Sequence, residues 1–305
     1  MTAVRLAPDA AAYYSSQSVV SEPGEMAGWY GGLPHGVGEL ARVVRDVVIH
    51  RLEGEQFGAA IPADRMRDDA ETRYVDDILR LIVARDDAPL TVRRAYGDRF
   101  VGTCRDFTLL HVSMLRHAGV PARLRSGFAD YFGTDGFHFD HVVTEYWDDA
   151  RGWLLADAQL ADPAITARFP VDFDPMDVPR DRFLVAGSAW QTIRSGAADP
   201  KTFGVQPEGP LVGEWFVAGS VRLDLAALNK TETLLWDIWG AGASSDDDMT
   251  DDIRTLYDRT ATITAAPDVP YEAARTLFTT TATLRTPRTV LSLAPFNGPR
   301  QVTLR

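Results

Sequence analysis

Cysteine is almost absent from the sequence. Cys104 is the single cysteine among 305 residues, which excludes a disulfide bond within the chain. The protein therefore makes no demand for an oxidising compartment. Lysine is almost as rare, because every basic residue other than Lys201 and Lys230 is an arginine. The chain itself thus offers few amine groups as nucleophiles.

Long apolar runs are missing too. No segment approaches the roughly 20 consecutive apolar residues of a membrane-spanning helix. The N-terminal segment, MTAVRLAPDAAAYYSSQSVV, lacks the charged stretch followed by a sustained apolar stretch that marks a secretory signal. We therefore expect a cytoplasmic protein that has no membrane partner.

An excess of positive charge is also absent. The formal net charge is -12, and the sequence contains no basic stripe. Both features oppose binding to the phosphate groups of nucleic acids or anionic lipids. The expected partner is a small molecule or a peptide.

Apolar residues are plentiful: they make up 45% of the chain, enough to bury a large core. We expect a single domain over residues 1–305. Its core would span about 95–160, with an N-terminal helical part over 1–94 and a C-terminal elaboration over 161–305.

The N-terminal part should begin with an irregular arm over 1–38, because this segment is rich in glycine, proline and serine. Apolar residues then recur with helical spacing over 39–52 and again over 72–85. These two segments predict helices.

The expected core is a helix followed by three strands. Residues 104–118 place apolar side chains on one stripe, so this helix should bury one face. Thr103 as N-cap and Asp106 form a capping-box pattern at its start. Strand-like segments follow at 122–132, 137–147 and 152–160. The predicted fold class is α+β, with a central antiparallel sheet and the helix of Cys104 packed on it.

The C-terminal part offers weaker signals and no cofactor motif. The acidic run over 244–252 lacks the alternating ligands of a calcium loop and is expected to be a solvated helix start. The glycines of GGLPHGVG lack the spacing of a phosphate loop. We expect no cofactor and no metal site. The patterns predict helices at 187–196, 221–230, 251–260 and 271–280, and a strand at 211–220.

Cys104 falls in the first turn of the predicted core helix, where the helix dipole favours a thiolate over a thiol. A nucleophilic thiolate needs a base nearby. His111 lies on nearly the same helix face, but the rise of about 1.5 Å per residue puts it roughly 10 Å away. His117 is farther still, which leaves His138 and His141 on the second strand.

His138 and His141 have opposite parity, so they face opposite sides of the sheet and only one should meet the helix. A hairpin centred near residue 149 would place His141 directly opposite Asp157. Cys104, His141 and Asp157 then supply a nucleophile, a base and a group that orients the base. Each residue alone is more often structural, since a lone buried cysteine is usually an inert small hydrophobe. The combination favours catalysis.

The combination resembles the transglutaminase-like superfamily, whose core is related to papain. The resemblance rests on GTCRDF at 102–107, DHVVTEYW at 140–147 and GWLLADAQL at 152–160. Beyond this core, the whole chain resembles bacterial transglutaminase-domain proteins. The resemblance implies that Cys104 is the nucleophile, His141 the general base and Asp157 the residue that orients it. Ala158 departs from the pattern, because many members have proline after the aspartate.

We therefore expect cysteine-dependent acyl transfer or hydrolysis at an amide, ester or thioester, through an acyl-thioester intermediate. The backbone N–H of Cys104 would help to hold the oxyanion. The long arm and the C-terminal elaboration favour a covered cleft and a narrow range of small-molecule or peptide acyl donors. A donor bound to a carrier in a biosynthetic pathway is one of the options. The alternatives are a non-catalytic binding protein with the same fold, or a general cysteine peptidase.

Overall fold

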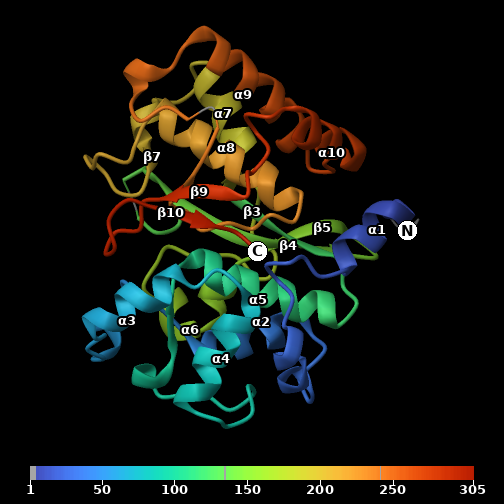
Figure 1. Ribbon diagram of the computed structural model, residues 1–305, viewed down its shortest axis with the longest axis vertical. Helices are drawn as coiled ribbons and strands as arrows, with labels where there is room; N and C mark the ends of the chain where they lie inside the picture. Colours follow the sequence, from blue (N-terminus) through green and yellow to red (C-terminus); the bar gives the residue numbers. More distant parts are fainter. Residues whose placement is uncertain (1–4, 134, 241) are drawn as a thin grey trace.

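The computed structural model describes residues 5–133, 135–240 and 242–305. A central antiparallel sheet separates two groups of helices (Figure 1). The helices between residues 37 and 166 lie below the sheet in this view, and those between residues 186 and 280 lie above it. The expected α+β fold class is confirmed.

The central sheet is built from consecutive strands. Its order is β5-β4-β3-β6 with antiparallel neighbours, and β7 pairs in parallel with the start of β4. Two smaller sheets accompany it, a parallel β1-β2 pair and the antiparallel set β10-β9-β8. The bounds are β1 Val48–His50, β2 Phe100–Gly102, β3 Ala122–Ala129, β4 His138–Asp148, β5 Gly152–Ala156, β6 Phe183–Val185, β7 Phe203–Gly204, β8 Asp237–Ile238, β9 Thr289–Ser292 and β10 Arg300–Thr303.

The two helix groups build two apolar clusters. One cluster joins α2, α4 and α5 to the sheet, and the other joins α7, α8, α9 and α10. None of the helices in the described part of the chain is long and apolar enough to cross a membrane. The bounds are α1 Pro8–Ser15, α2 Val37–Val47, α3 Ala63–Asp68, α4 Val75–Arg85, α5 Cys104–His117, α6 Pro163–Thr166, α7 Ala186–Arg194, α8 Glu214–Leu228, α9 Asp251–Thr264 and α10 Tyr271–Thr280.

The central helix α5 begins where its sequence predicts. The N–H of Thr103 donates to Asp106 Oδ2 at 2.8 Å, which completes the capping box. Gly119, with φ +80°, follows the end of the helix. The expectation of one buried face was wrong, because every residue from Cys104 to Arg116 is buried. The sheet covers one side of α5, and α2, α4 and the N-terminal arm cover the other.

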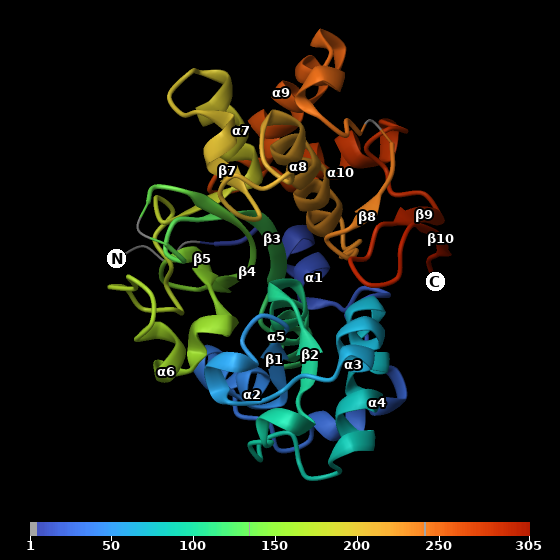
Figure 2. The same ribbon diagram turned by 90° about the vertical axis from the view of Figure 1, so that its left-hand side faces the viewer.

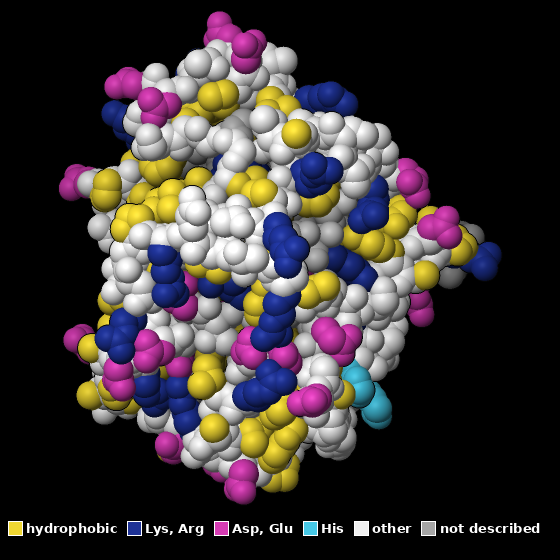
Figure 3. Space-filling view, viewed as in Figure 1, with side chains coloured by type: hydrophobic (Ala, Val, Ile, Leu, Met, Phe, Trp, Pro, Cys, Tyr) yellow, Lys and Arg dark blue, Asp and Glu magenta, His cyan; other side chains and the backbone are white. Residues whose placement is uncertain are grey.

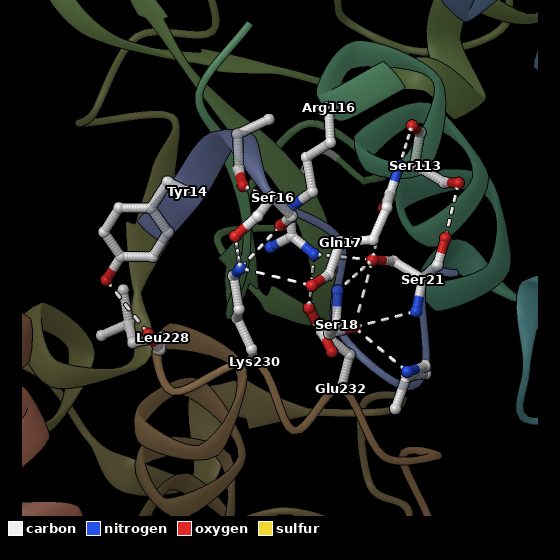
Figure 4. A network of polar contacts seen from close by, with 12 residues as sticks. Tyr14, Ser16, Gln17, Ser18, Ser21, Ser113, Arg116, Leu228, Lys230 and Glu232 are labelled. Atoms are coloured by element: carbon white, nitrogen blue, oxygen red, sulfur yellow. Dashed lines mark hydrogen bonds and ion pairs between the residues drawn. The ribbon is translucent and has the colours of Figure 1, made fainter. Parts of the chain in front are cut away.

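The polar residues of α5 tolerate this burial because they have partners. Near its C-terminal end, Arg116 donates to Ser21 and pairs with Glu232 at 3.0 Å (Figure 4). In the same network Lys230 donates to the carbonyl of Ser16, so residues from both ends of the chain meet at the end of α5. Buried charges are stabilised when they are paired and hydrogen-bonded in this way.

The hairpin of β4 and β5 has a different register from the one we expected. Trp147 pairs with Trp153 rather than with Arg151, so the register is displaced by two residues. The turn is set by Gly152, whose φ of +85° suits glycine, and by Asp148, which accepts from the N–H of Arg151. A shift of two residues keeps every side chain on its expected face.

Three other predictions need correction. The arm over 1–38 is partly helical, since it contains α1 and a 3₁₀ turn at Gly24–Tyr30. The helix predicted over 39–52 ends at Val47, and its last residues form β1. The segment 211–220 is not a strand, because α8 begins at Glu214. This helix is buried nearly all round, and periodicity cannot separate a short, wholly apolar helix segment from a strand.

The acidic run over 244–252 contains a 3₁₀ turn at Asp246–Asp248 and leads into α9, which begins at Asp251. Thr250 accepts from the N–H of Ile253, and Asp248 accepts from Ser244. Within the part of the chain that the structure describes, no group of three or more His, Cys, Asp or Glu side chains is arranged to hold a metal ion. On the face drawn in Figure 3, acidic side chains lie among basic ones.

Candidate active site

His141 and Asp157 are joined by a hydrogen bond. The Nε2 atom of His141 lies 2.8 Å from Asp157 Oδ2. The same oxygen accepts from the hydroxyl of Tyr131 at 2.9 Å, and Oδ1 accepts from the N–H of Gln159 at 3.0 Å. Asp157 is therefore held by two partners besides the histidine. This arrangement fixes the orientation of the imidazole ring, because Nε2 has one position in which it can donate.

Cys104 lies at the start of α5, with 6% of its surface exposed. Because Nε2 of His141 is engaged by Asp157, Nδ1 is the atom left to face the thiol. Burial opposes the charged imidazole, but the charge and hydrogen bond of Asp157 and the hydrogen bond and charge of Cys104 raise the pKa of His141 to about 10. The site therefore favours a protonated imidazolium beside Cys104 at neutral pH.

The contact between His141 and Cys104 does not follow from the alternation of side chains along β4. The body of α5 contacts the even-numbered residues of β4, as in the 3.0 Å contact of His111 with Thr144. His141 has the other parity, and it lies beyond the ladder to β5, which begins at Thr144. The sheet curls along β4, and the start of this strand meets the N-terminal end of α5 rather than its side.

The other candidate histidines on the core are engaged elsewhere. His111 is buried between Thr144 Oγ1 and the carbonyl of Val37, both at 3.0 Å, and burial lowers its pKa to about 4. His138 stacks on Phe203 with ring centroids 4.4 Å apart. His117 packs edge-on against Tyr30. None of these three contacts involves Cys104.

Aromatic rings surround the imidazole of His141. The ring centroid of Phe132 lies 4.8 Å from it, that of Tyr131 6.1 Å and that of Phe183 6.2 Å. His141 itself is 3% exposed. The rings keep bulk water from the pair of His141 and Asp157, which strengthens the electrostatic interaction between them.

Sequence reasoning missed His50. Strand β1 pairs in parallel with β2, and His50 lies opposite Gly102, next to the start of α5. The N–H of Leu52 donates to His50 Nδ1 at 3.3 Å, so the proton of the neutral ring is on Nε2. Burial, then the charges of Arg51, His141 and Arg45, lower the pKa of His50 to about 3.

Two features of the sequence concealed this contact. The segment containing His50 continues the apolar pattern of α2, and its partner strand is far along the chain. A three-residue parallel strand also carries too few residues for a period of two to be visible. Tyr131 was missed as well, since a lone tyrosine after a strand gives no sign of its partner.

Residues 80–158 match the family model of the transglutaminase-like superfamily. One solved structure, from Cytophaga hutchinsonii, is described provisionally as a cysteine protease. It shares 15% sequence identity with this chain, with a TM-score of 0.33, and the match covers 53% of this chain and 45% of that one. No curated protein matches the sequence. The matched segment contains Cys104, His141 and Asp157.

Proposed function

We propose that this protein is a cysteine-dependent acyltransferase or hydrolase, because residues 80–158 match the family model of the transglutaminase-like superfamily. Cys104, His141 and Asp157 are its catalytic and orienting residues. The observation that carries the proposal is the chain of contacts from Asp157 through His141 to the thiol at the start of α5. In this arrangement the imidazole can both keep the thiolate charged and deliver a proton.

In the first half of the reaction, the Cys104 thiolate attacks the carbonyl carbon of an amide, ester or thioester. The new C–S bond forms as the carbonyl electrons move to oxygen. The N–H of Cys104 lies in the first turn of α5, where backbone N–H groups have no intrahelical acceptor, and it can hold the oxyanion. His141 Nδ1 then gives its proton to the leaving group, and the tetrahedral species collapses to the acyl-thioester.

In the second half, His141 takes a proton from water or from an amine as that acceptor attacks the thioester. The C–S bond breaks and the thiolate returns. The neutral ring of His50, with its proton on Nε2, is a candidate for the second oxyanion donor, because it lies beside Gly102 and is uncharged at neutral pH. A neutral donor stabilises the oxyanion without competing with His141 for the thiolate.

The burial of the site supports a narrow choice of substrate. Cys104 and His141 are nearly inaccessible, with 6% and 3% of their surfaces exposed. An open groove that accepts any polypeptide would leave them freely accessible. We therefore propose a restricted small-molecule or peptide acyl donor, and little activity on generic proteins such as casein. Efficient amine incorporation into casein, or its broad proteolysis, would contradict this specificity.

The test is intact-mass spectrometry after incubation with a panel of acyl donors, including amides, esters and thioesters. We expect a mass increase equal to one acyl group, located on Cys104 after digestion, in the wild type. Cys104→Ala should show none. Unmodified wild-type protein across all three donor classes, together with an alkylation rate no faster than that of a free thiol, would contradict the proposed function.

A further inference from the structure

Arg51 is anchored next to the candidate nucleophile. It follows the last residue of β1, and its N–H donates to the carbonyl of Gly102 at 2.9 Å. Gly102 is the last residue of β2, directly before the cap of α5. Burial lowers the pKa of the half-buried Arg51, and the charges of Cys104 and Asp106 partly oppose this change. The guanidinium therefore lies within electrostatic reach of the thiol.

The side chain of Arg51 stacks on rings from the C-terminal part of the chain. Its guanidinium carbon lies 5.8 Å from the ring centroid of Trp236 and 6.0 Å from that of Phe296. The N–H of Leu293 donates to the carbonyl of Trp236 at 3.0 Å, so the segment before β8 is joined to the end of β9. Figure 2 shows β8, β9 and β10 close to α3, so the end of the chain has returned to the N-terminal helices.

The guanidinium of Arg51 has donors to spare. Among the described residues it has neither a hydrogen-bond acceptor nor an ion-pair partner. Neighbouring arginines are engaged: Arg45 donates to Glu53 at 2.7 Å, and Arg105 donates to Asp106 at 2.9 Å. Asp106 is already occupied by Arg105 and by the cap of α5.

The ring beneath Arg51 carries a second unused donor. The Nε1 atom of Trp236 is buried and has no acceptor in the described part of the chain. A buried indole N–H usually has a partner, because leaving it unpaired costs about 1–3 kcal/mol. Two unpaired donors, one charged and one neutral, thus lie on one stack of side chains beside Cys104.

We propose that Arg51 and Trp236 form a carboxylate-binding subsite, and that the acyl donor carries a carboxylate close to the carbonyl that Cys104 attacks. This inference rests on the proposed function and specifies its substrate class. A guanidinium binds a carboxylate with two parallel hydrogen bonds, and an indole N–H adds a third. The guanidinium is positioned for this contact by its cation–π contacts with the rings of Trp236 and Phe296.

The test compares two alkylating agents that differ only in the group to be recognised. Iodoacetate carries a carboxylate and iodoacetamide carries a neutral amide, and both lose iodide to the Cys104 thiolate. The measurement is the ratio of the two second-order rate constants at pH 7. In the wild type the ratio should exceed that of a free thiol, because the subsite holds the carboxylate of iodoacetate.

Variants locate the effect. Arg51→Gln should lower the ratio by about fivefold or more, since it removes the charge-assisted hydrogen bonds. Trp236→Phe keeps a ring for stacking but removes the N–H, and should lower the ratio by about twofold. Arg275→Gln is the matched control, because Arg275 on α10 also stacks on an aromatic ring, that of Tyr13. Its ratio should equal that of the wild type.

The possible outcomes separate the subsite from the chemistry. If Cys104 is highly reactive but Arg51→Gln leaves the ratio unchanged, the carboxylate subsite is refuted and the proposed function stands. If both rate constants fall together in Arg51→Gln, Arg51 stabilises the thiolate rather than a substrate, which also refutes the subsite. If Cys104 of the wild type reacts no faster than a free thiol with either reagent, the proposed function fails first.

Discussion

Strand β4 carries two buried charged clusters of opposite character. Near its start, His141 joins Asp157 and Cys104. Farther along, Glu145 accepts from Arg123 and Arg125 through Oε2 and from Arg180 through Oε1, at 2.7 to 2.8 Å. Arg125 also pairs with Asp224 of α8 through two hydrogen bonds of 3.0 Å. Apart from Arg180, whose side chain is 33% exposed, both clusters are almost inaccessible to solvent.

The two clusters differ in the residue that carries the positive charge. The cluster of Glu145 uses arginines, which keep their protons at any ordinary pH, and its carboxylate oxygens are fully engaged. The cluster of Cys104 uses a histidine whose pKa is about 10 and whose Nδ1 faces the thiol of Cys104. One cluster holds the sheet to α8, whereas the proposed function requires the other to move a proton. The comparison indicates that buried charge alone does not mark a reactive site. What distinguishes such a site is a cation that can lose its proton.

The largest expected effect on the acylation rate comes from replacing His141. His141→Ala should reduce the rate of acylation of Cys104 by at least about 10⁴-fold, because it removes the base and the proton donor. His111→Ala is the control and should lower the melting temperature with little loss of rate per folded molecule. The measurement is single-turnover acylation followed by mass spectrometry. If His138→Ala were the inactive variant and His141→Ala were active, the assignment of the base would be wrong.

Matched carboxylate variants sharpen the comparison between the two clusters. Asp157→Asn should reduce acylation by about 10³-fold, because the amide no longer fixes the ring and charge of His141. Its effect on stability should be modest, because the N–H of Gln159 can still donate to the amide oxygen at the Oδ1 position, and the hydroxyl of Tyr131 can rotate to accept from the amide nitrogen at the Oδ2 position. Equal acylation rates for Asp157→Asn and the wild type would show that His141 does not need its partner.

The corresponding change in the second cluster should act on stability instead. Glu145→Gln leaves buried arginines without their counter-charge and should lower the free energy of unfolding by about 3–5 kcal/mol. The rate of acylation per folded molecule should stay within about twofold of the wild type. Urea denaturation and single-turnover acylation on the same preparation check both parts. A large loss of rate with unchanged stability would remove the distinction between the clusters.

Replacing His50 tests whether the oxyanion has a second hydrogen-bond donor. His50→Ala should lower the acylation rate by about 10²-fold, the usual cost of one oxyanion-hole donor. The rate of alkylation of Cys104 by iodoacetamide should change little, because alkylation forms no oxyanion. Loss of both rates to the same extent would assign His50 to the thiolate rather than to the oxyanion.

The smallest effect is the dependence of stability on pH. The raised pKa of His141 means that its contribution is complete below about pH 6.5 and is lost as the pH rises towards 10. The lowered pKa of Glu145, where arginine charges outweigh burial, gives a contribution that is present above about pH 4.3 and is lost as the pH falls.

Each group contributes a slope of at most about 1.4 kcal/mol per pH unit. Urea midpoints of the wild type, His141→Ala and Glu145→Gln across pH 3 to 10 measure both slopes. The difference between the wild type and His141→Ala should shrink above pH 7, and the difference between the wild type and Glu145→Gln should shrink below pH 4. A constant difference in either series would contradict the assigned direction.

The sequence by itself determined the local structure of the candidate site, namely the ends of α5 and the alternation of side chains along β4 and β5. Thr103, Asp106 and Gly119 mark the ends of α5, because caps and left-handed glycines act within a few residues. The period of two along β4 and β5 placed His141 and Asp157 on one face. The register itself was wrong by two residues, and Asp157 lies after the end of β5, so its contact with His141 is a side-chain hydrogen bond and not a pairing in the ladder.

Only the tertiary structure decided which distant residues pack around the start of α5. His50 and Arg51 reach the start of α5 through a short parallel strand pair, and Trp236 arrives from the far end of the chain. Contacts of this kind leave no periodic trace, because they depend on how separate elements pack. The burial of α5 on all sides was equally hidden: its polar residues look exposed in sequence, and they are buried only because distant residues such as Glu232 neutralise them.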